Sequence, residues 1–594
     1  MITLPNNKQW TQSNLSDAQG SLVGTFNVDL TANLGRARVR RTIQTTRQTV
    51  NIDLTNYPVG FKVFDSGANI WTAAGSSGVG KTHKSASASA NSVFLPDTTT
   101  GFPTDCDSTL SDIEVTAFGG ATSYLCVTAN SKLYYRSNGN WSNTSLLAGG
   151  GPWMMTAYAS RLYVAISGIS KIVAATNPTT GLGTAVLTLD DIYRPTFLRS
   201  SSNRIWIGTR ANTGKGYIFE WDGASAQVTR AYRLESQGAI ACVIKNDLPW
   251  VIDTEGRLLT YAGGSFREVD RLPGLSGKLF LQATNPVNDR FIHPNGMTLN
   301  EGKINMLIRN EIGDAISPVS GSIPEFCPSG IWEYDENIGL YHKNSLSYLF
   351  ANTNILTDYG QNRLAGVGAL SEMKLPNVAA NDTGNLLAGA TVYTNASLTD
   401  AGIFTDDTFE NVSGTNAATQ ASGYLVTPWI DSPNVQDVWQ KIFVTYKQFL
   451  TATDKIILKY RTTEAIPLEI SITWVTTSKF TTTTNVLGRE GQEVEVTQGT
   501  GSGKTAHITT IDVAGSVYTV NLDDTFTGVT TGTAKARLQA WVKLGEITGQ
   551  TAEVSELSIG AQSPRIQLKC CMLFTGKNEL HRLALVNQGH QPAE

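Results

Sequence analysis

Short runs of alternating apolar and polar residues recur along the first two-thirds of the chain. Four such runs follow one another in residues 112–146, with Gly, Asn and Ser at the breaks. The second run of each group begins at positions 123, 161, 204 and 248, so the groups are 38, 43 and 44 residues apart. Alternation at period two predicts β-strands. Four short strands repeated every ~40–50 residues are typical of β-propeller blades.

The spacing then widens, and further groups start near residues 304–310 and 386–394. One blade cannot bury both of its faces, so the repeat predicts a ring of blades packed on one another. We count six blades, or seven if the strand-like runs in 61–74 pair with the C-terminal end of the repeat and close the ring.

After about residue 420 the strands become longer and alternate clearly, as in a two-sheet sandwich of jelly-roll type. A Gly-rich segment with short strands interrupts them and predicts a small barrel inserted in a sandwich loop. The predicted fold is all-β. Its parts are an N-terminal strand-like assembly segment (1–55), a β-propeller (56–415), a β-sandwich (416–483 and 538–594) and an inserted small β-barrel (484–537).

The composition agrees with a large β protein whose strands bury one another. The chain has 594 residues, of which only 16% are charged, and its formal net charge is −4. This net charge does not indicate that the chain as a whole binds nucleic acid or an anionic membrane. The first 20 residues do not have the pattern of a signal peptide, and no apolar run is long enough to span a bilayer. The six cysteines lack metal-like spacing, which indicates buried thiols in a protein folded in a reducing cytoplasm.

Residues 75–82 (GSSGVGKT) match the spacing of a phosphate-binding loop. That motif works only between a buried strand and a helix whose N-terminal amides hold the phosphates. Here a Ser/Ala run follows, without an amphipathic period. A second, shorter likeness at 499–505 lies between two predicted strands. We interpret both as turns, and expect no nucleotide and no other cofactor.

No other pattern supplies a catalytic set. The histidines show no ligand spacing, and His342 falls on a strand-like run where a surface or edge position is expected. Neighbouring aspartates at strand ends are explained by turns, although they could also hold Ca²⁺ or act as acid and base. Nucleophile elbows and repeated Asp-boxes are absent. We therefore expect no catalytic residues and no metal site, and hence no enzyme.

One cluster of charges is unusual. Arg36, Arg38 and Arg40 alternate with Ala37 and Val39, so all three arginines project from one face of a strand. A solvated face or a charged edge strand explains them, and so does an assembly contact with an acidic partner or with the DNA backbone. The surrounding segment has too little apolar content for its own core, so we expect it to add to a sheet edge of its propeller or of a neighbour.

The phrases at 12–42, 329–347 (SGIWEYDENIGLYHKNSLS) and 454–464 (DKIILKYRTTE) resemble tailed-bacteriophage virion proteins. This class combines a propeller with sandwich modules at the tail, connector or tail tip, and includes the nozzle proteins of short-tailed phages. The resemblance implies a non-enzymatic structural subunit located in the virion tail and assembled in the host cytoplasm. Its partners would be copies of itself in a ring, neighbouring tail proteins and phage DNA passing the lumen.

Two other classes stay open. A glycan-binding adhesin or receptor-binding protein would use exposed tryptophans to stack on host surface glycans, although most tryptophans lie in strand-like runs where a core role is expected. A polysaccharide-degrading propeller enzyme would need paired carboxylates, for which the sequence offers no pattern.

Overall fold

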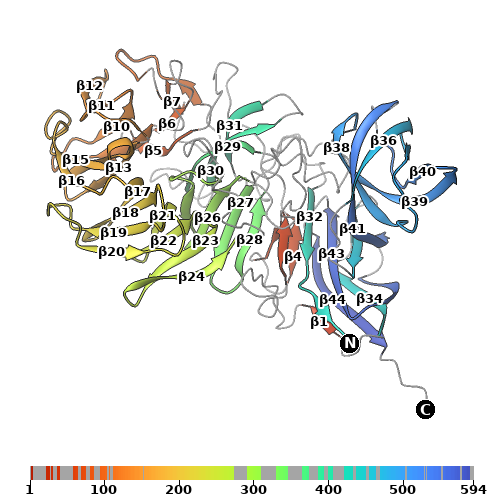
Figure 1. Cartoon of the computed structure of the whole chain (residues 1–594). Helices are drawn as coiled ribbons and strands as arrows, with labels where there is room; N and C mark the ends of the chain where they lie inside the picture. The colour runs from red at the N-terminus through yellow and green to blue at the C-terminus, as the bar shows by residue number, and fades with distance from the viewer. Residues whose placement is uncertain are drawn as a thin grey trace.

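The computed structural model is entirely β-structured apart from one 3-10 turn, Ser167–Ile169, in the residues that it describes (Figure 1). These are most of 58–272, 291–309, 330–344, 364–405 and 421–588, with short pieces of 2–39. The predicted class is confirmed: a propeller is followed by a sandwich that carries a small barrel.

Seven antiparallel sheets form the propeller blades. Blade 1 comprises β5 (Phe61–Phe64), β6 (Asn69–Ala74), β7 (Lys81–Ser85) and β8 (Phe94–Pro96). Blade 2 comprises β9 (Asp112–Thr116), β10 (Tyr124–Ala129), β11 (Lys132–Arg136) and β12 (Ser142–Ser145). Blade 3 comprises β13 (Trp153–Tyr158), β14 (Arg161–Ile166), β15 (Lys171–Ala175) and β16 (Ala185–Thr188). Blade 4 comprises β17 (Tyr193–Ser201), β18 (Arg204–Ala211), β19 (Tyr217–Trp221) and β20 (Arg230–Arg233).

The remaining blades have wider connections. Blade 5 comprises β21 (Ala239–Lys245), β22 (Leu248–Asp253), β23 (Arg257–Ala262) and β24 (Ser265–Arg271). Blade 6 comprises β25 (Met297–Asn300), β26 (Lys303–Ile308), β27 (Gly330–Asp335) and β28 (Gly339–Asn344). Blade 7 comprises β29 (Leu364–Glu372), β30 (Leu386–Tyr393) and β31 (Thr399–Thr405). Middle strands such as β10 and β14 are buried at nearly every position, because adjacent blades cover both of their faces.

The ring closes between the first and the last blade. β5 contacts β9 on one side and β29 on the other, and the Ala369 N–H donates to the Pro58 carbonyl at 2.8 Å. A Cβ on Gly368 would lie 2.0 Å from that carbonyl oxygen, so only glycine permits this approach. The choice between six and seven blades, left open by the sequence, is thereby settled as seven.

Two sheets make the sandwich. One contains β34 (Val438–Tyr446), β42 (Val554–Gln562) and β44 (Glu579–Gln588). The other contains β32 (Ala421–Val426), β35 (Lys455–Arg461), β43 (Arg565–Phe574) and the second half of β41 (Gly532–Thr548), with β33 (Ile430–Asp431) beside β43. Cys570 faces the core between the sheets and Cys571 the opposite side, as their adjacency in a strand requires.

The N-terminal segment adds strands to this sandwich. β1 (Ile2–Leu4) and β4 (Ala37–Val39) pair with β44, β3 (Val28–Asp29) pairs with β4, and β2 (Gly24–Phe26) pairs with β32. Their apolar side chains, such as Leu22 and Leu30, are buried in the sandwich core. We expected the N-terminal segment to add to a sheet edge, either of its own propeller or of a neighbouring molecule. The edge used belongs to the sandwich of the same chain, because that core lacks a cover on this side.

The barrel is larger than the predicted insertion at 484–537. It comprises β36 (Leu468–Thr476), β37 (Lys479–Thr482), β38 (Gln492–Gly499), β39 (Thr505–Ala514), β40 (Val517–Leu522) and the first half of β41, and it closes through the pairing of β38 with β41. Residues 468–482 and 538–541, expected in the sandwich, thus contribute to the barrel, because the 17-residue strand β41 runs through both modules.

Blade 6 joins the propeller to the sandwich. β2 and β3 pack on β28, and the Thr25 hydroxyl accepts a hydrogen bond from the His342 backbone N–H at 2.8 Å. Ile338 and Tyr341 of this blade belong to the sandwich core. His342 lies on the edge strand of its blade, one of the two positions expected for it. It is nevertheless fully buried against Trp332, because N-terminal strands cover that edge, so the surface position is wrong.

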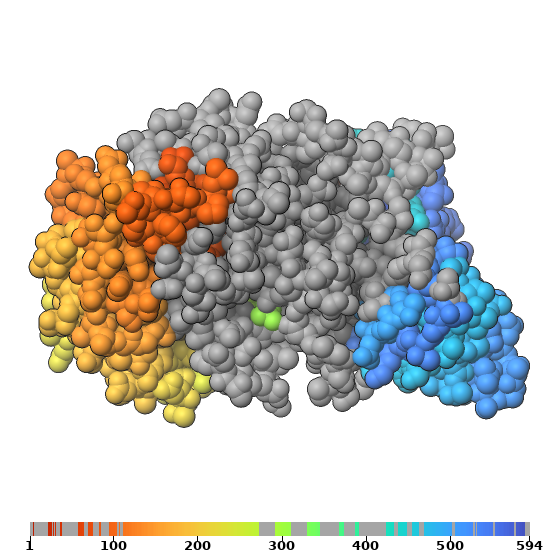
Figure 2. Space-filling model, turned by 90° about the horizontal axis from the view of Figure 1, so that it is seen from above, coloured from red at the N-terminus to blue at the C-terminus, as the bar shows by residue number. Residues whose placement is uncertain are grey.

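Figure 2 shows blades 1 to 5 at one end of the molecule and the C-terminal modules at the other.

Candidate interaction surfaces

The arginine strand meets acidic residues of its own chain. The guanidinium of Arg36, which is 48% exposed, lies 2.7 Å from the buried carboxylate of Glu579 on β44. Arg38 is half-buried and stands opposite Glu579 on one neighbouring strand and Asp29 on the other. Arg40 lies outside the described residues. The acidic surface expected for this face is therefore supplied at least in part within the chain.

The phosphate-loop likeness at 75–82 ends in a strand, not in a helix. Lys81 and Thr82 begin β7, which pairs with β6 through Thr82↔Ala73 and Lys81↔Ala74. Residues 75–80 themselves lie outside the described part. The second likeness likewise connects β38 to β39. The helix N-terminus that the phosphate-binding chemistry requires does not follow either motif.

A polar network crosses the propeller axis. The Asn295 amide group donates to the Val59 carbonyl of blade 1 at 2.7 Å and to the Asp112 carboxylate of blade 2 at 2.8 Å. Its amide oxygen accepts a bond from Arg199 of blade 4 at 2.6 Å, and its carbonyl accepts one from Leu370 of blade 7 at 2.9 Å. Burial raises the pKa of Asp112, and the Met155 N–H and Arg199 oppose that rise. One asparagine, just before β25 of blade 6, thus connects blades 1, 2, 4 and 7.

Other buried charges also connect strands and blades. The Asp97 carboxylate accepts a bond from the Trp141 indole at 2.6 Å and faces Arg136, whose guanidinium lies over the Trp71 ring at 4.7 Å. Near the sandwich, the Lys343 ammonium and the Tyr341 hydroxyl both bind the buried Glu333 carboxylate.

The tryptophans considered for glycan stacking lie mainly in the blades. Five of the six are buried and pack in blade cores: Trp141, Trp153, Trp206, Trp221 and Trp332. Trp250 is partly buried against blade 6. A core role is therefore confirmed for the first five.

The sandwich and the barrel share a buried charged interface. The Lys459 ammonium of β35 lies 2.5 Å from the Glu493 carboxylate of β38, and both side chains are at most 2% exposed. Burial alone would raise the pKa of Glu493, but Lys459 holds it below its usual value. Beside this pair, the His507 ring contacts Asp523 at 3.1 Å, and Asp523 contacts Lys543 at 2.9 Å. Burial, followed by the charge of Lys459, lowers the pKa of His507.

Cations and aromatic rings alternate on the outer face of one sandwich sheet. Sequence reasoning missed this ladder, because its residues come from five separate segments and no local motif marks them. It runs through Arg565, Trp429, Arg461, Trp541, Lys569 and Tyr424, with cation-to-ring distances of 4.3, 5.4, 4.5, 5.7 and 4.5 Å in that order. Arg565, Trp429 and Arg461 are partly exposed, whereas Trp541, Lys569 and Tyr424 are buried. The ladder therefore runs from the surface to the buried part of this sheet face.

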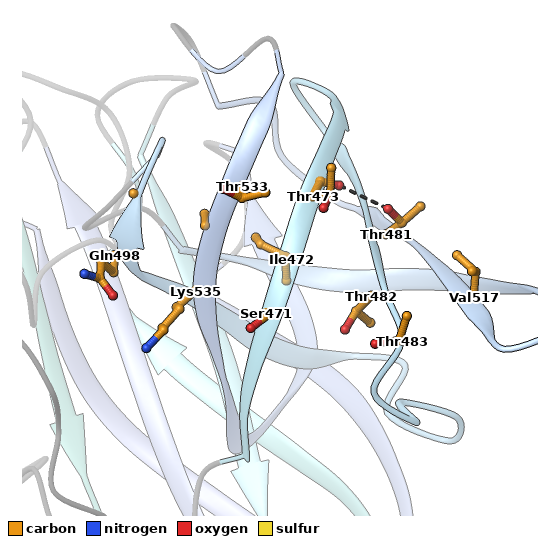
Figure 3. A pocket seen from close by; sticks show the side chains of 12 residues that line it. Ser471, Ile472, Thr473, Thr481, Thr482, Thr483, Gln498, Val517, Thr533 and Lys535 are labelled. Carbon is orange, nitrogen blue, oxygen red and sulfur yellow. Dashed lines mark hydrogen bonds between the residues drawn. The ribbon is translucent and has the colours of Figure 1, made fainter.

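A shallow trough of about 630 Å³ lies on the outer face of the barrel (Figure 3). Hydroxyl groups of residues on β36, β41 and the end of β37 line it, together with one amide and one ammonium group. Thr473 and Thr481 stand on adjacent strands, and the Thr481 hydroxyl donates to the Thr473 carbonyl at 3.3 Å. Its polar lining is Ser471, Thr473, Thr481, Thr482, Thr483, Gln498, Thr533 and Lys535. Such a surface offers hydrogen-bond donors and acceptors without carboxylates.

The described residues contain no cluster of three His, Cys, Asp or Glu side chains able to hold a metal ion. Nor does this part of the chain include a helix that could span a bilayer.

No family model matches the chain, and no curated protein is similar to it in sequence. Similar solved structures include the computationally designed Ika8 protein, with 11% identity and a TM-score of 0.33, covering 67% of this chain and 99% of that one. The β-propeller domain of Cps50 (Swd1) from Myceliophteria thermophila has 9% identity and a TM-score of 0.34, covering 59% and 98%. BamB from Moraxella catarrhalis has 10% identity and a TM-score of 0.31, covering 65% and 96%. Likenesses at this level concern the propeller fold alone.

Proposed function

We propose that this protein is a non-enzymatic structural subunit of a tailed-phage virion, in a nozzle, connector or tail-tip ring. The observation that carries the proposal is the use of the buried charged and polar groups. They link blade to blade (Asn295, Arg199), propeller to sandwich (Thr25) and sandwich to barrel (Lys459, Glu493). A scaffold that transmits position between neighbours needs such links between its modules.

The resemblance of three sequence phrases to phage virion proteins supports the location in a tail. In such a ring, DNA would pass through a lumen formed by several copies. The propeller channel is not suited to that role, since Asn295 and Arg199 cross it.

The test is to locate the chain in phage particles. A peptide tag of small size after Glu594, labelled with gold, is expected to decorate the tail in electron micrographs, and the chain should copurify with particles in a fixed copy number. Absence from purified particles, with the chain free in the lysate, would reject the proposal.

Glycan binding is a second candidate, favoured by the trough on the barrel. Its hydroxyl and amide groups can exchange hydrogen bonds with sugar hydroxyls, and the threonine methyl groups can contact sugar C–H faces. On a glycan array, Lys535→Ala together with Thr473→Val should lose any signal that the wild-type chain gives. The matched control Lys479→Ala with Thr509→Val changes barrel residues that do not line the trough. Equal signals from both variants would reject this site.

A further inference from the structure

The core of the sandwich is covered to different degrees on its two sides. On the side of the N-terminal strands, Leu4, Leu22 and Val28 are at most 3% exposed. On the opposite side, Leu544 of β41 and Leu557 and Ile559 of β42 pack on the same core but are only half-buried. The first side is sealed because added strands cover it. The second side lacks such a cover in the described part of the chain.

β42 is the edge strand on that open side. It pairs with β34 and forms the end of its sheet. Its side chains alternate between exposed and half-buried, with Val554 54% exposed and the Glu556 side chain 48% exposed. The register shifts near Gly560, whose φ is +68°, so a bulge interrupts the strand there. A bulge ends regular pairing, which leaves residues 554–558 as the edge that another strand can join.

This edge points away from the propeller. In the order β3-β4-β44-β34-β42, the β3 end packs on blade 6, and β42 occupies the other end of the sheet. Its exposed charges are mainly acidic: Glu553 and Glu556 face solvent, with Lys441 of β34 3.1 Å from Glu556. A fitting partner is therefore a short extended strand with cationic side chains.

The propeller presents such a strand at the opposite end of the molecule. β20, the outer edge of blade 4, has four residues, of which Arg230, Ala231 and Arg233 are exposed (Figure 1). The strand itself carries no carboxylate, and the nearest acidic partner is Glu220 of β19, which stands opposite Arg230. The other outer strands differ: β8, β12 and β16 carry no charge, and β24 pairs Arg271 with its own Glu268. On β28, Lys343 is buried and bound to Glu333. Among the outer blade strands with described side chains, β20 is therefore the exposed cationic edge.

We propose that β20 of one copy adds to residues 554–558 of β42 in the next copy, with Arg230 and Arg233 beside Glu553 and Glu556. This contact rests on the proposed function and deepens it, because it names the surfaces through which copies meet. The two surfaces are different and lie at opposite ends of the chain, so the contact is head-to-tail, the kind that generates rings or filaments. The same sandwich already accepts β1 and β2 in this manner. A pairing of four or five residues is weak alone, so association depends on concentration and falls with salt.

A charge exchange tests the contact. One full-length variant carries Arg230→Glu with Arg233→Glu, and a second carries Glu553→Lys with Glu556→Lys. Sedimentation velocity of the wild type is expected to show reversible self-association. Each variant alone should associate about tenfold more weakly, because like charges then face each other across the contact. An equal mixture of the two variants should regain wild-type association, since every contact between unlike variants pairs opposite charges.

The control is Glu490→Lys, which reverses an exposed carboxylate on a barrel turn that belongs to neither of the two edges and should leave association unchanged. Hydrogen exchange should also show slower exchange of the amides of 554–558 in the associated species. A wild-type chain that stays monomeric at its highest soluble concentration, or a mixture that does not regain association, would overturn the proposal. If gold labelling still places the chain in tails, the structural role stands and only this contact is rejected.

Discussion

Asn295 illustrates how one side chain can hold a ring of blades together. Replacing it by alanine removes its bonds to Val59, Asp112 and Arg199 and leaves a buried carboxylate with fewer donors. An unsatisfied buried group of this kind costs about 1–3 kcal/mol, more when charged. We expect Asn295→Ala to lower the propeller unfolding temperature in calorimetry. Asn143→Ala, at an exposed position of β12, is the control and should change it little. Equal temperatures for both variants would contradict the role of the network.

His507 makes the interface between sandwich and barrel sensitive to acid. Its pKa in the folded chain is lowered from the ordinary 6.5, so folding favours the neutral ring. The stability that this provides is complete above the unfolded pKa and is lost as pH falls below it. The His507→Gln variant should therefore lose less stability than the wild type between about pH 7 and pH 5. His581→Gln, on β44, is the comparison. Parallel pH profiles of denaturant unfolding for wild type and His507→Gln would refute this expectation.

Residue-level chemistry was the least predictable from sequence. Burial of the blade tryptophans followed from their position in apolar runs. The ladder from Arg565 to Tyr424 did not, because its members are up to 145 positions apart and meet only through sheet pairing. His342 shows the same limit: its strand is an edge in the blade, and only a segment over 300 residues away buries it.

Among the elements, the barrel offers the clearest test of the module boundaries. β35 and β41 are neighbours with Tyr460 opposite Val542, so a short Gly/Ser turn can replace residues 463–540 and join them directly. We expect that deletion to leave the sandwich folded, because a shorter connection costs little closure entropy. Replacing only 484–537 should cause aggregation, since it would expose the barrel core residues Ile472, Trp474 and Phe480. Protection of β34 and β44 amides in hydrogen exchange distinguishes the outcomes; loss of protection after the longer deletion would disprove the boundary.

In the N-terminal element, a charge-reversing substitution of Arg36 would affect the fold of its own chain. Arg36→Glu would place a carboxylate beside the buried Glu579, so the change should destabilise the sandwich as well as any contact outside the chain. We expect a lower unfolding temperature for Arg36→Glu than for Arg36→Gln, measured by calorimetry on the isolated chain. Identical temperatures would mean that the ion pair is unimportant. Reversal of the arginine face therefore tests assembly only if the isolated chain keeps its stability.

Sequence periodicity predicts elements better than their limits. Alternation identified the strands of the sandwich and the insertion of a barrel. It could not place the boundary, because β41 is one continuous strand of 17 residues while its neighbours change from barrel strands to sandwich strands. The division of a strand between two modules is a property of pairing, not of its own residues.

For the whole molecule, the repeat of four strands was sufficient to predict the propeller and the order of its modules. The number of blades depended on a contact between Pro58 and Ala369, which no local pattern contains. The union of propeller and sandwich was equally hidden, because it uses N-terminal strands that bring together segments from both ends of the chain.

That union predicts how the molecule unfolds. Tyr341 lies in blade 6 but belongs to the sandwich core, whereas Tyr163 lies within blades 3 and 4; both are nearly fully buried and their hydroxyls donate to an oxygen at 2.7 and 2.8 Å. Truncating a large buried side chain costs about 3–5 kcal/mol. Tyr341→Ala should therefore increase hydrogen exchange in blade 6 and in β34 and β44 together. Tyr163→Ala should increase it in blades 3 and 4 while β34 and β44 keep their protection. If Tyr341→Ala leaves the sandwich strands as protected as in the wild type, the propeller and sandwich are independent bodies, and a rigid link between them cannot be the basis of a structural role.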